Sequence, residues 1–162
     1  MAATAEGLDA QYTDRVTITI RLASEGDVPV LLALFAELHP DDPAPSAQAA
    51  ASAWQAIEGQ SGRTVLLAES DGAVVGTVDC ATLPNLTRGA RSFMLVENVV
   101  VAAGHRRSGV GAALMEAALA LARQAHCYKV QLLSRASREA AHAFYESLGF
   151  RPAAQGYRLY LD

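Results

Sequence analysis

The stretch Ser92–Gly111, SFMLVENVVVAAGHRRSGVG, bears on both the fold and the function of this chain. Its first half, Ser92–Val101, predicts a strand, and the apolar pattern that follows predicts a helix over Gly109–Ala125. Two glycines at the helix start let the backbone approach a ligand closely and leave several N–H groups unpaired. Those donors and the positive end of the helix dipole favour a phosphate group. Arg106 and Arg107 add positive charge beside the same turn, so the stretch predicts a phosphate-binding site.

This turn has three alternative interpretations: an ATP-binding loop, a dinucleotide-binding loop and a turn that serves only packing. No Gly-Lys-Ser/Thr triplet follows it, so it is not the Walker A loop of ATP-binding proteins. It also lacks the third glycine and the acidic residue of the dinucleotide-binding fingerprint. A tight turn that serves only helix packing stays open at this point. A phosphate-bearing ligand other than ATP or NAD is therefore the prediction.

Alternating and helical apolar patterns predict the remaining elements, in the order β-α-α-β-β-β-α-β-α-β. The predicted strands are Val16–Leu22, Thr64–Glu69, Ala73–Leu83, Ser92–Val101, Val130–Leu133 and Tyr157–Leu161. Helices are predicted from Val28 to Leu38, from a Ser46 cap to Ile57, over Gly109–Ala125, and from a Ser137 cap through Tyr145 to Gly149. The dipeptide Asp71–Gly72 predicts a type I′ hairpin turn. A mixed sheet with helices on both faces buries all these apolar stripes, so the fold class is α/β.

Length and composition limit the class of protein. The 162 residues suit one domain, expected from 15 to 162 after a flexible leader at 1–14. A net charge of −4 and a single lysine, Lys129, argue against nucleic acid as a partner. No apolar run approaches the length of a membrane span, and nothing indicates export, so a cytoplasmic protein is expected. Cys80 and Cys127 do not have metal-ligand spacing, so no metal site is predicted.

Three motifs in order resemble the GNAT acyltransferases. Arg106–Gly111 matches that superfamily's [Q/R]-x-x-G-x-[G/A] signature, and Ala141–Phe150 (AHAFYESLGF) is similar to its C-terminal block. Glu97–Val101 resembles the strand that precedes the signature. The resemblance implies a mostly antiparallel sheet of six to seven strands, splayed between two central parallel strands. It also implies acetyl-CoA as co-substrate.

The same resemblance implies which residues hold acetyl-CoA. The cofactor would lie between Ser92–Val101 and Val130–Leu133, its pantetheine arm paired with backbone near Val99 and Val101 as an added strand. Many members have Asn where this chain has Arg138, so Ser134 or Ser137 is expected to replace that contact. The implied cofactor-binding residues are Val99, Val100, Val101, Arg106, Arg107, Ser108, Gly109, Val110, Gly111, Ala112, Ser134 and Ser137.

Two residues are candidates for catalysis. An amine must lose its proton before it attacks a thioester, so a general base is expected. Glu97 is that candidate, and strict alternation places it on one face with Leu95, Val99 and Val101, an apolar setting that raises a carboxyl pKa. A bulge in this strand, which is frequent in similar proteins, would change that placement. The alternative is a glutamate in a structural ion pair. The family match makes Tyr145 the general acid for the departing thiolate; the alternative is a core tyrosine.

The predicted function is transfer of an acetyl group from acetyl-CoA to a primary amine of a small molecule, by direct attack in a ternary complex. A protein or peptide N-acetyltransferase and a non-catalytic acyl-CoA-binding module remain as alternatives. The loops His39–Pro45 and Pro84–Arg91 border the acceptor site in similar folds, but their residues do not identify the amine. A homodimer is an open expectation, because dimers are common among similar proteins.

Overall fold

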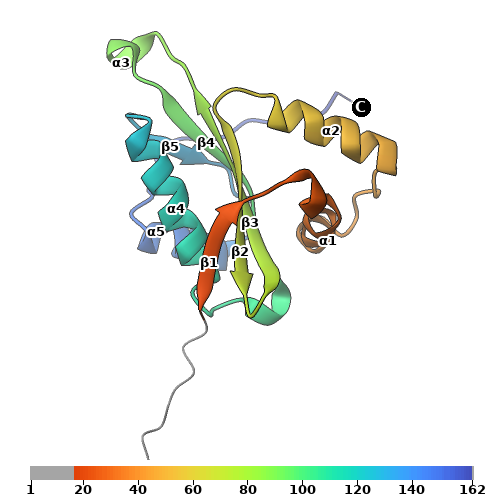
Figure 1. Cartoon of the computed structure of the whole chain (residues 1–162). Coiled ribbons are helices and arrows are strands. Elements are labelled where there is room, and N and C mark those ends of the chain that lie inside the picture. Colours follow the sequence, from red (N-terminus) through yellow and green to blue (C-terminus); the bar gives the residue numbers. More distant parts are fainter. Residues whose placement is uncertain (1–16, 162) are drawn as a thin grey trace, which may run out of the picture.

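One mixed sheet organises the computed structural model, which describes residues 17–161 (Figure 1). Within them the strand order is β1-β2-β3-β4-β5. The first three pairings are antiparallel, and β4 and β5 are parallel. The strands are β1 Ile18–Leu22, β2 Arg63–Ser70, β3 Ala73–Leu83, β4 Phe93–Val101 and β5 Val130–Leu132. The predicted leader at 1–14 lies outside the described residues.

Helices cover both faces of this sheet, as predicted. Figure 1 shows α4 on one side of the strands and α1 and α2 on the other. The α-helices are α1 Val28–Leu38, α2 Ala47–Glu58, α3 Thr87–Ala90, α4 Val110–Gln124 and α5 Glu139–Ser147, with short 3₁₀ turns η1 Glu25–Asp27 and η2 Ala103–His105. No helix in this described part of the chain is long and apolar enough to cross a membrane.

Local signals in the sequence set most of these boundaries. The β2–β3 turn places Asp71 and Gly72 at φ angles of 51° and 78°, as a type I′ turn requires. The Ser46 side chain caps α2 by accepting a hydrogen bond from the Ala49 amide, at 3.2 Å between oxygen and nitrogen. Helix α1 ends at Leu38, two residues before Pro40, which cannot donate a backbone hydrogen bond. These three predictions are confirmed.

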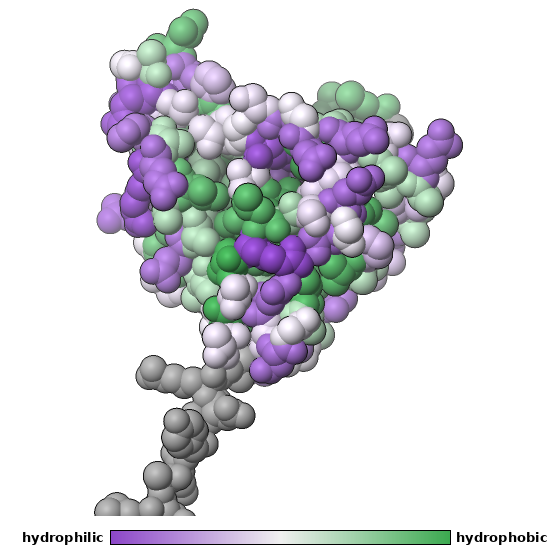
Figure 2. Space-filling view, viewed as in Figure 1, coloured by the Kyte–Doolittle hydropathy of each residue, from purple (hydrophilic) through white to green (hydrophobic). Residues whose placement is uncertain are grey.

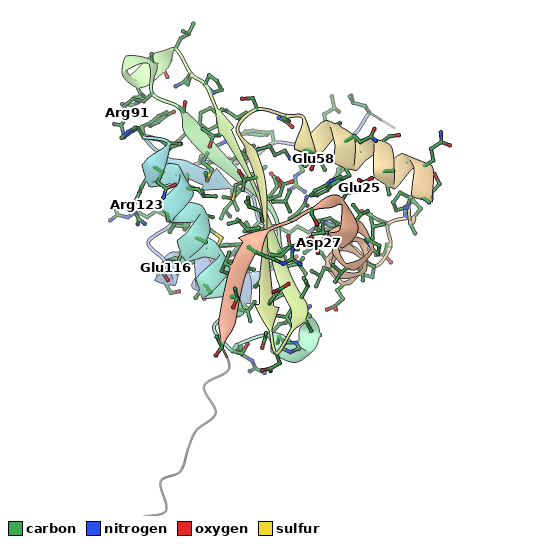
Figure 3. All side chains as sticks on the ribbon, in the orientation of Figure 1. Glu25, Asp27, Glu58, Arg91, Glu116 and Arg123 are labelled. Carbon is green, nitrogen blue, oxygen red and sulfur yellow. The ribbon has the colours of Figure 1, made fainter. Side chains whose placement is uncertain are left out.

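Two apolar cores, one on each face, hold the layers together. On the α4 side, Leu114 and Met115 are fully buried against the sheet. On the α1–α2 side, Trp54 and Leu31 pack against fully buried Leu67 of β2. On the outward surface of α4, Glu116 and Arg123 project away from the sheet (Figure 3), and Figure 2 shows hydrophilic residues among apolar ones on this side of the molecule.

Two sequence predictions are wrong. Six to seven strands were expected, whereas the described residues form five, because Tyr157–Leu161 is not a strand. An alternating pattern stabilises a strand only when a neighbour pairs with its backbone and one face is buried. Here Tyr157 and Leu161 are 85% and 93% exposed. Ser137 does not cap α5 either, because Arg138 occupies the cap position before the first helical residue. A hydrogen bond from the Arg138 amide to the Arg135 carbonyl, 3.0 Å between nitrogen and oxygen, closes a turn there.

Candidate active site

The two parallel strands separate part-way along β4. Residues 94–96 of β4 pair with residues 130–132 of β5, and the last pair is Val96 with Leu132. Strand β5 ends there, while β4 continues to Val101. Among the described residues, the rest of this β4 edge has no partner strand on the β5 side. An extended ligand can therefore pair with the exposed backbone groups of β4.

A bulge interrupts β4 at the start of this unpaired edge. In the register with β3, Val78 alone stands opposite two residues of β4, Asn98 and Val99. Asn98 adopts a left-handed backbone conformation with φ of 52°, which asparagine tolerates better than most residues. A bulge of this kind bends the strand and reverses which face the following side chains occupy.

The bulge corrects the sequence prediction for Glu97. Strict alternation placed Glu97 on one face with Val99 and Val101, in apolar surroundings. Instead Val99 and Val101 pack against the same core as Val96, three positions before Val99. Glu97 is exposed and projects into the opening between the strands. A carboxylate in this position can accept a proton from a molecule that enters the opening.

The opening forms a pocket that gathers several of the predicted residues. Glu97 and Val99 of β4, Ser134 after β5 and Tyr145 of α5 all line it. His39, just after α1, also lines it, so residues from the α1 side of the sheet meet Val99 and Tyr145, which pack with the core on the α4 side. The structure therefore brings the two catalytic candidates to one place from elements far apart in sequence.

Tyr145 lines this pocket while its ring is held in the core. The side chain is 9% exposed, and its ring centroid lies 5.2 Å from that of Phe144 and 5.9 Å from that of Phe150. No hydrogen bond of the hydroxyl is recorded within residues 17–161. Burial raises the pKa of the phenol, and the negative charge of Glu97 raises it further while Arg138 lowers it. The hydroxyl therefore keeps its proton at neutral pH and can donate it.

Ser134 contributes an unsatisfied polar group to the residues that line this pocket. Its hydroxyl oxygen is buried and has no hydrogen-bond partner in the described part of the chain. A buried hydroxyl without a partner is costly, so a polar group supplied by a ligand stabilises it. Ser137, the other serine expected to contact pantetheine, is exposed and does not line the pocket.

The turn before α4 has the backbone geometry predicted for an anion site. Gly109 precedes the helix at φ of 89°, and no side chain caps the first turn of α4. A Cβ at Gly111 would lie 3.3 Å from the Phe144 ring, so a larger residue does not fit without movement. The amides at the start of α4 are therefore free to receive a phosphate group. Val110, also predicted to bind the cofactor, is fully buried and packs its side chain in the core.

The two arginines of this turn have different surroundings. Arg106 donates from Nε to the Val101 carbonyl at 3.1 Å and lies 3.6 Å from a Glu37 carboxylate oxygen. Glu37 also accepts from the Ala103 amide, so this set of contacts attaches the turn to α1. Arg107 is exposed, with a left-handed φ of 61°. Of the two, Arg107 is free to move toward a bound anion.

Sequence reasoning did not select three cationic residues that line the pocket. Arg135 and Arg138 follow β5, and Arg158 lies in the C-terminal segment, which crosses behind the sheet toward α2 (Figure 1). Arg138 had been noted only as a departure from the family motif. No local pattern marks Arg135 or Arg158, because the packing of distant segments brings them together.

Comparisons with known proteins agree with this geometry. Residues 31–150 match the model of the Acetyltransferase (GNAT) family. The chain is 32% identical over 147 residues to a glucosamine 6-phosphate N-acetyltransferase of Trypanosoma brucei brucei, covering 91% of this chain and 98% of that protein. A proposed acetyltransferase from Agrobacterium tumefaciens str. C58 has a solved structure with 39% identity and a TM-score of 0.84, covering 88% of this chain and 99% of the other.

A more distant structure extends the likeness of fold. An aminoglycoside N-acetyltransferase solved in complex with CoA superimposes with a TM-score of 0.76 at 17% identity, covering 90% of this chain and 95% of that one. The family match runs from within α1 to just past the end of α5 and so includes both parallel strands and the turn before α4. This chain belongs to the GNAT family of acetyltransferases.

Proposed function

We propose that the protein moves the acetyl group of acetyl-CoA to a primary amine of a small molecule, by direct attack in a ternary complex. The observation that supports this most is one pocket that joins the Glu97 carboxylate, the Tyr145 hydroxyl and the orphaned Ser134 hydroxyl. That pocket opens at the head of the unpaired β4 edge, which leads to the anion-binding turn at Gly109.

In the proposed reaction, each side chain handles one proton. Glu97 removes a proton from the ammonium group, directly or through a water, so that the nitrogen lone pair becomes free. The amine nitrogen forms a bond to the thioester carbon, and the amide of Val99 stabilises the negative charge on the carbonyl oxygen. The nitrogen of the intermediate then loses its second proton to water, the carbon–sulfur bond breaks, and Tyr145 donates its proton to the departing thiolate and regains one from solvent.

The cysteines of the chain support direct attack over an acetyl-enzyme. Cys80 is fully buried in the core, and burial raises the pKa of its thiol to about 12. A thiol in that state is a poor nucleophile at neutral pH. Cys127 does not line the pocket. Neither cysteine is therefore suited to carry the acetyl group between acetyl-CoA and the amine.

Glucosamine 6-phosphate is the first acceptor to assay, because the Trypanosoma relative is named for it. With any active amine, Glu97→Gln keeps the shape of the side chain but removes the base. We expect turnover to fall on the order of 10²-fold at pH 7. The loss should shrink as pH rises, since a neutral amine needs no base. Release of free thiol from acetyl-CoA measures both effects.

Glu116→Gln is the matched control, because Glu116 lies on the outward surface of α4, away from the pocket (Figure 3). It should have the turnover of the unchanged protein at every pH. If Glu97→Gln also kept full turnover at pH 7, the carboxylate would have a structural role and the proposed base would be wrong.

A further inference from the structure

We propose that the acceptor amine carries a phosphate group and that Arg135, Arg138 and Arg158 bind it. This inference rests on the proposed function and names the class of its acceptor. All three arginines line the pocket that holds Glu97 and Tyr145. Each is exposed, and no ion pair to a carboxylate is recorded for any of them in residues 17–161. Their charge is therefore available to a ligand.

The charge of this pocket fits a dianion. Three guanidinium groups face one carboxylate, Glu97, which leaves an excess of two positive charges in a chain whose net charge is −4. A phosphate monoester carries a charge of about −1.5 to −2 at pH 7 and offers three acceptor oxygens. Guanidinium groups bind such oxygens in bidentate pairs. A single carboxylate would leave part of this positive charge uncompensated.

These arginines lie away from the place expected for the phosphates of CoA. That place is the turn before α4, and β4 reaches its end at Val101 roughly 13 Å beyond Glu97, by the usual rise per strand residue. On α5, Phe144 lies beside Gly111 of the turn, whereas Arg138 is roughly 9 Å nearer the start of the helix. The two cationic regions therefore suit the two ends of a ternary complex.

The same arrangement orients the acceptor. Glu97 attracts the ammonium group, and the three arginines attract the phosphate, so a molecule with both charges binds in one direction. The amine then lies beside the Glu97 carboxylate, on the side of the pocket where Tyr145 can protonate the leaving thiolate. Amines with several positive charges and no anion are repelled by the arginines. Phosphorylated amines are therefore the expected acceptors, and polyamines and aminoglycosides are not.

The test compares matched pairs of amines that differ only in phosphate: glucosamine 6-phosphate with glucosamine, and phosphoethanolamine with ethanolamine. In the pair that the enzyme acetylates, we expect kcat/KM to be at least about 10²-fold higher for the phosphorylated amine than for the other. In Arg135→Gln and Arg158→Gln this ratio should fall by about 10-fold or more each, with affinity for CoA retained. Raising the salt concentration should also reduce the ratio. Arg123→Gln, on the outward surface of α4, is the matched control and should keep it.

Calorimetry gives a second readout that does not depend on turnover. CoA-loaded protein should bind glucosamine 6-phosphate more tightly than glucosamine, and the Arg135→Gln and Arg158→Gln variants should lose that difference. Equal binding of the two sugars, or a preference that survives both substitutions, would overturn the inference. The proposed function would still stand if other amines supported thiol release. Loss of CoA affinity in both variants would instead assign the arginines to the cofactor. If no amine supported thiol release, the proposed function would fail, and calorimetry would still decide the acceptor site.

Discussion

At the scale of single residues, Tyr145 gives the most specific prediction. Tyr145→Phe removes the hydroxyl but keeps the ring between Phe144 and Phe150, so the melting temperature should stay close to that of the unchanged protein. Turnover should fall roughly 10- to 10³-fold, because the thiolate leaves without an acid. An acetyl thioester of a more acidic thiol should recover much of the rate. Equal losses with both thioesters would show that the hydroxyl positions the donor and gives no proton.

At the scale of elements, the turn before α4 gives a prediction about cofactor affinity. Gly111→Val places branched carbons against the Phe144 ring, and Gly109→Val forces a β-branched residue to a φ of 89°. Both variants should lose CoA affinity by roughly 10-fold or more in calorimetry, because the amides proposed to bind phosphate shift. Gly104→Ala is the control, since its added Cβ meets nothing within 4 Å and its φ is not left-handed. Unchanged affinity in both valine variants would exclude this turn as the phosphate site.

Elements also show how far the sequence alone predicts this protein. The hairpin turn at Asp71–Gly72 and the Ser46 cap were predictable, because their causes lie within a few residues. A bulge in β4 was an alternative that the family resemblance left open, but its place at Asn98 was not predictable, since it depends on how β4 aligns with β3. Because of the bulge, Glu97 is exposed in the opening and not surrounded by apolar side chains, as strict alternation had predicted. Arg158 joins the pocket only through the path of the C-terminal segment, so no pattern in the sequence placed it there.

At the scale of the whole molecule, the sheet separates two kinds of surface. On the side that carries α4, Glu116 and Arg123 face outward, whereas the opening between β4 and β5 gathers three arginines, a carboxylate and a phenol. The resemblance of three motifs indicated the family, which the match over residues 31–150 confirms. The number of strands was overestimated, because the alternating pattern of Tyr157–Leu161 predicted a strand in a C-terminal segment whose apolar side chains are exposed.

The central claim is direct acetyl transfer from acetyl-CoA to an amine that carries a phosphate group. Initial rates of thiol release, measured while glucosamine 6-phosphate and acetyl-CoA are both varied, test it most directly. We expect one amide formed per thiol released and double-reciprocal lines that intersect, because both substrates are bound before any bond breaks. Parallel lines, or thiol release without an amine, would indicate an acetyl-enzyme and contradict direct attack. If CoA bound but no amine led to thiol release from acetyl-CoA, the protein would be a CoA-binding module and not an enzyme.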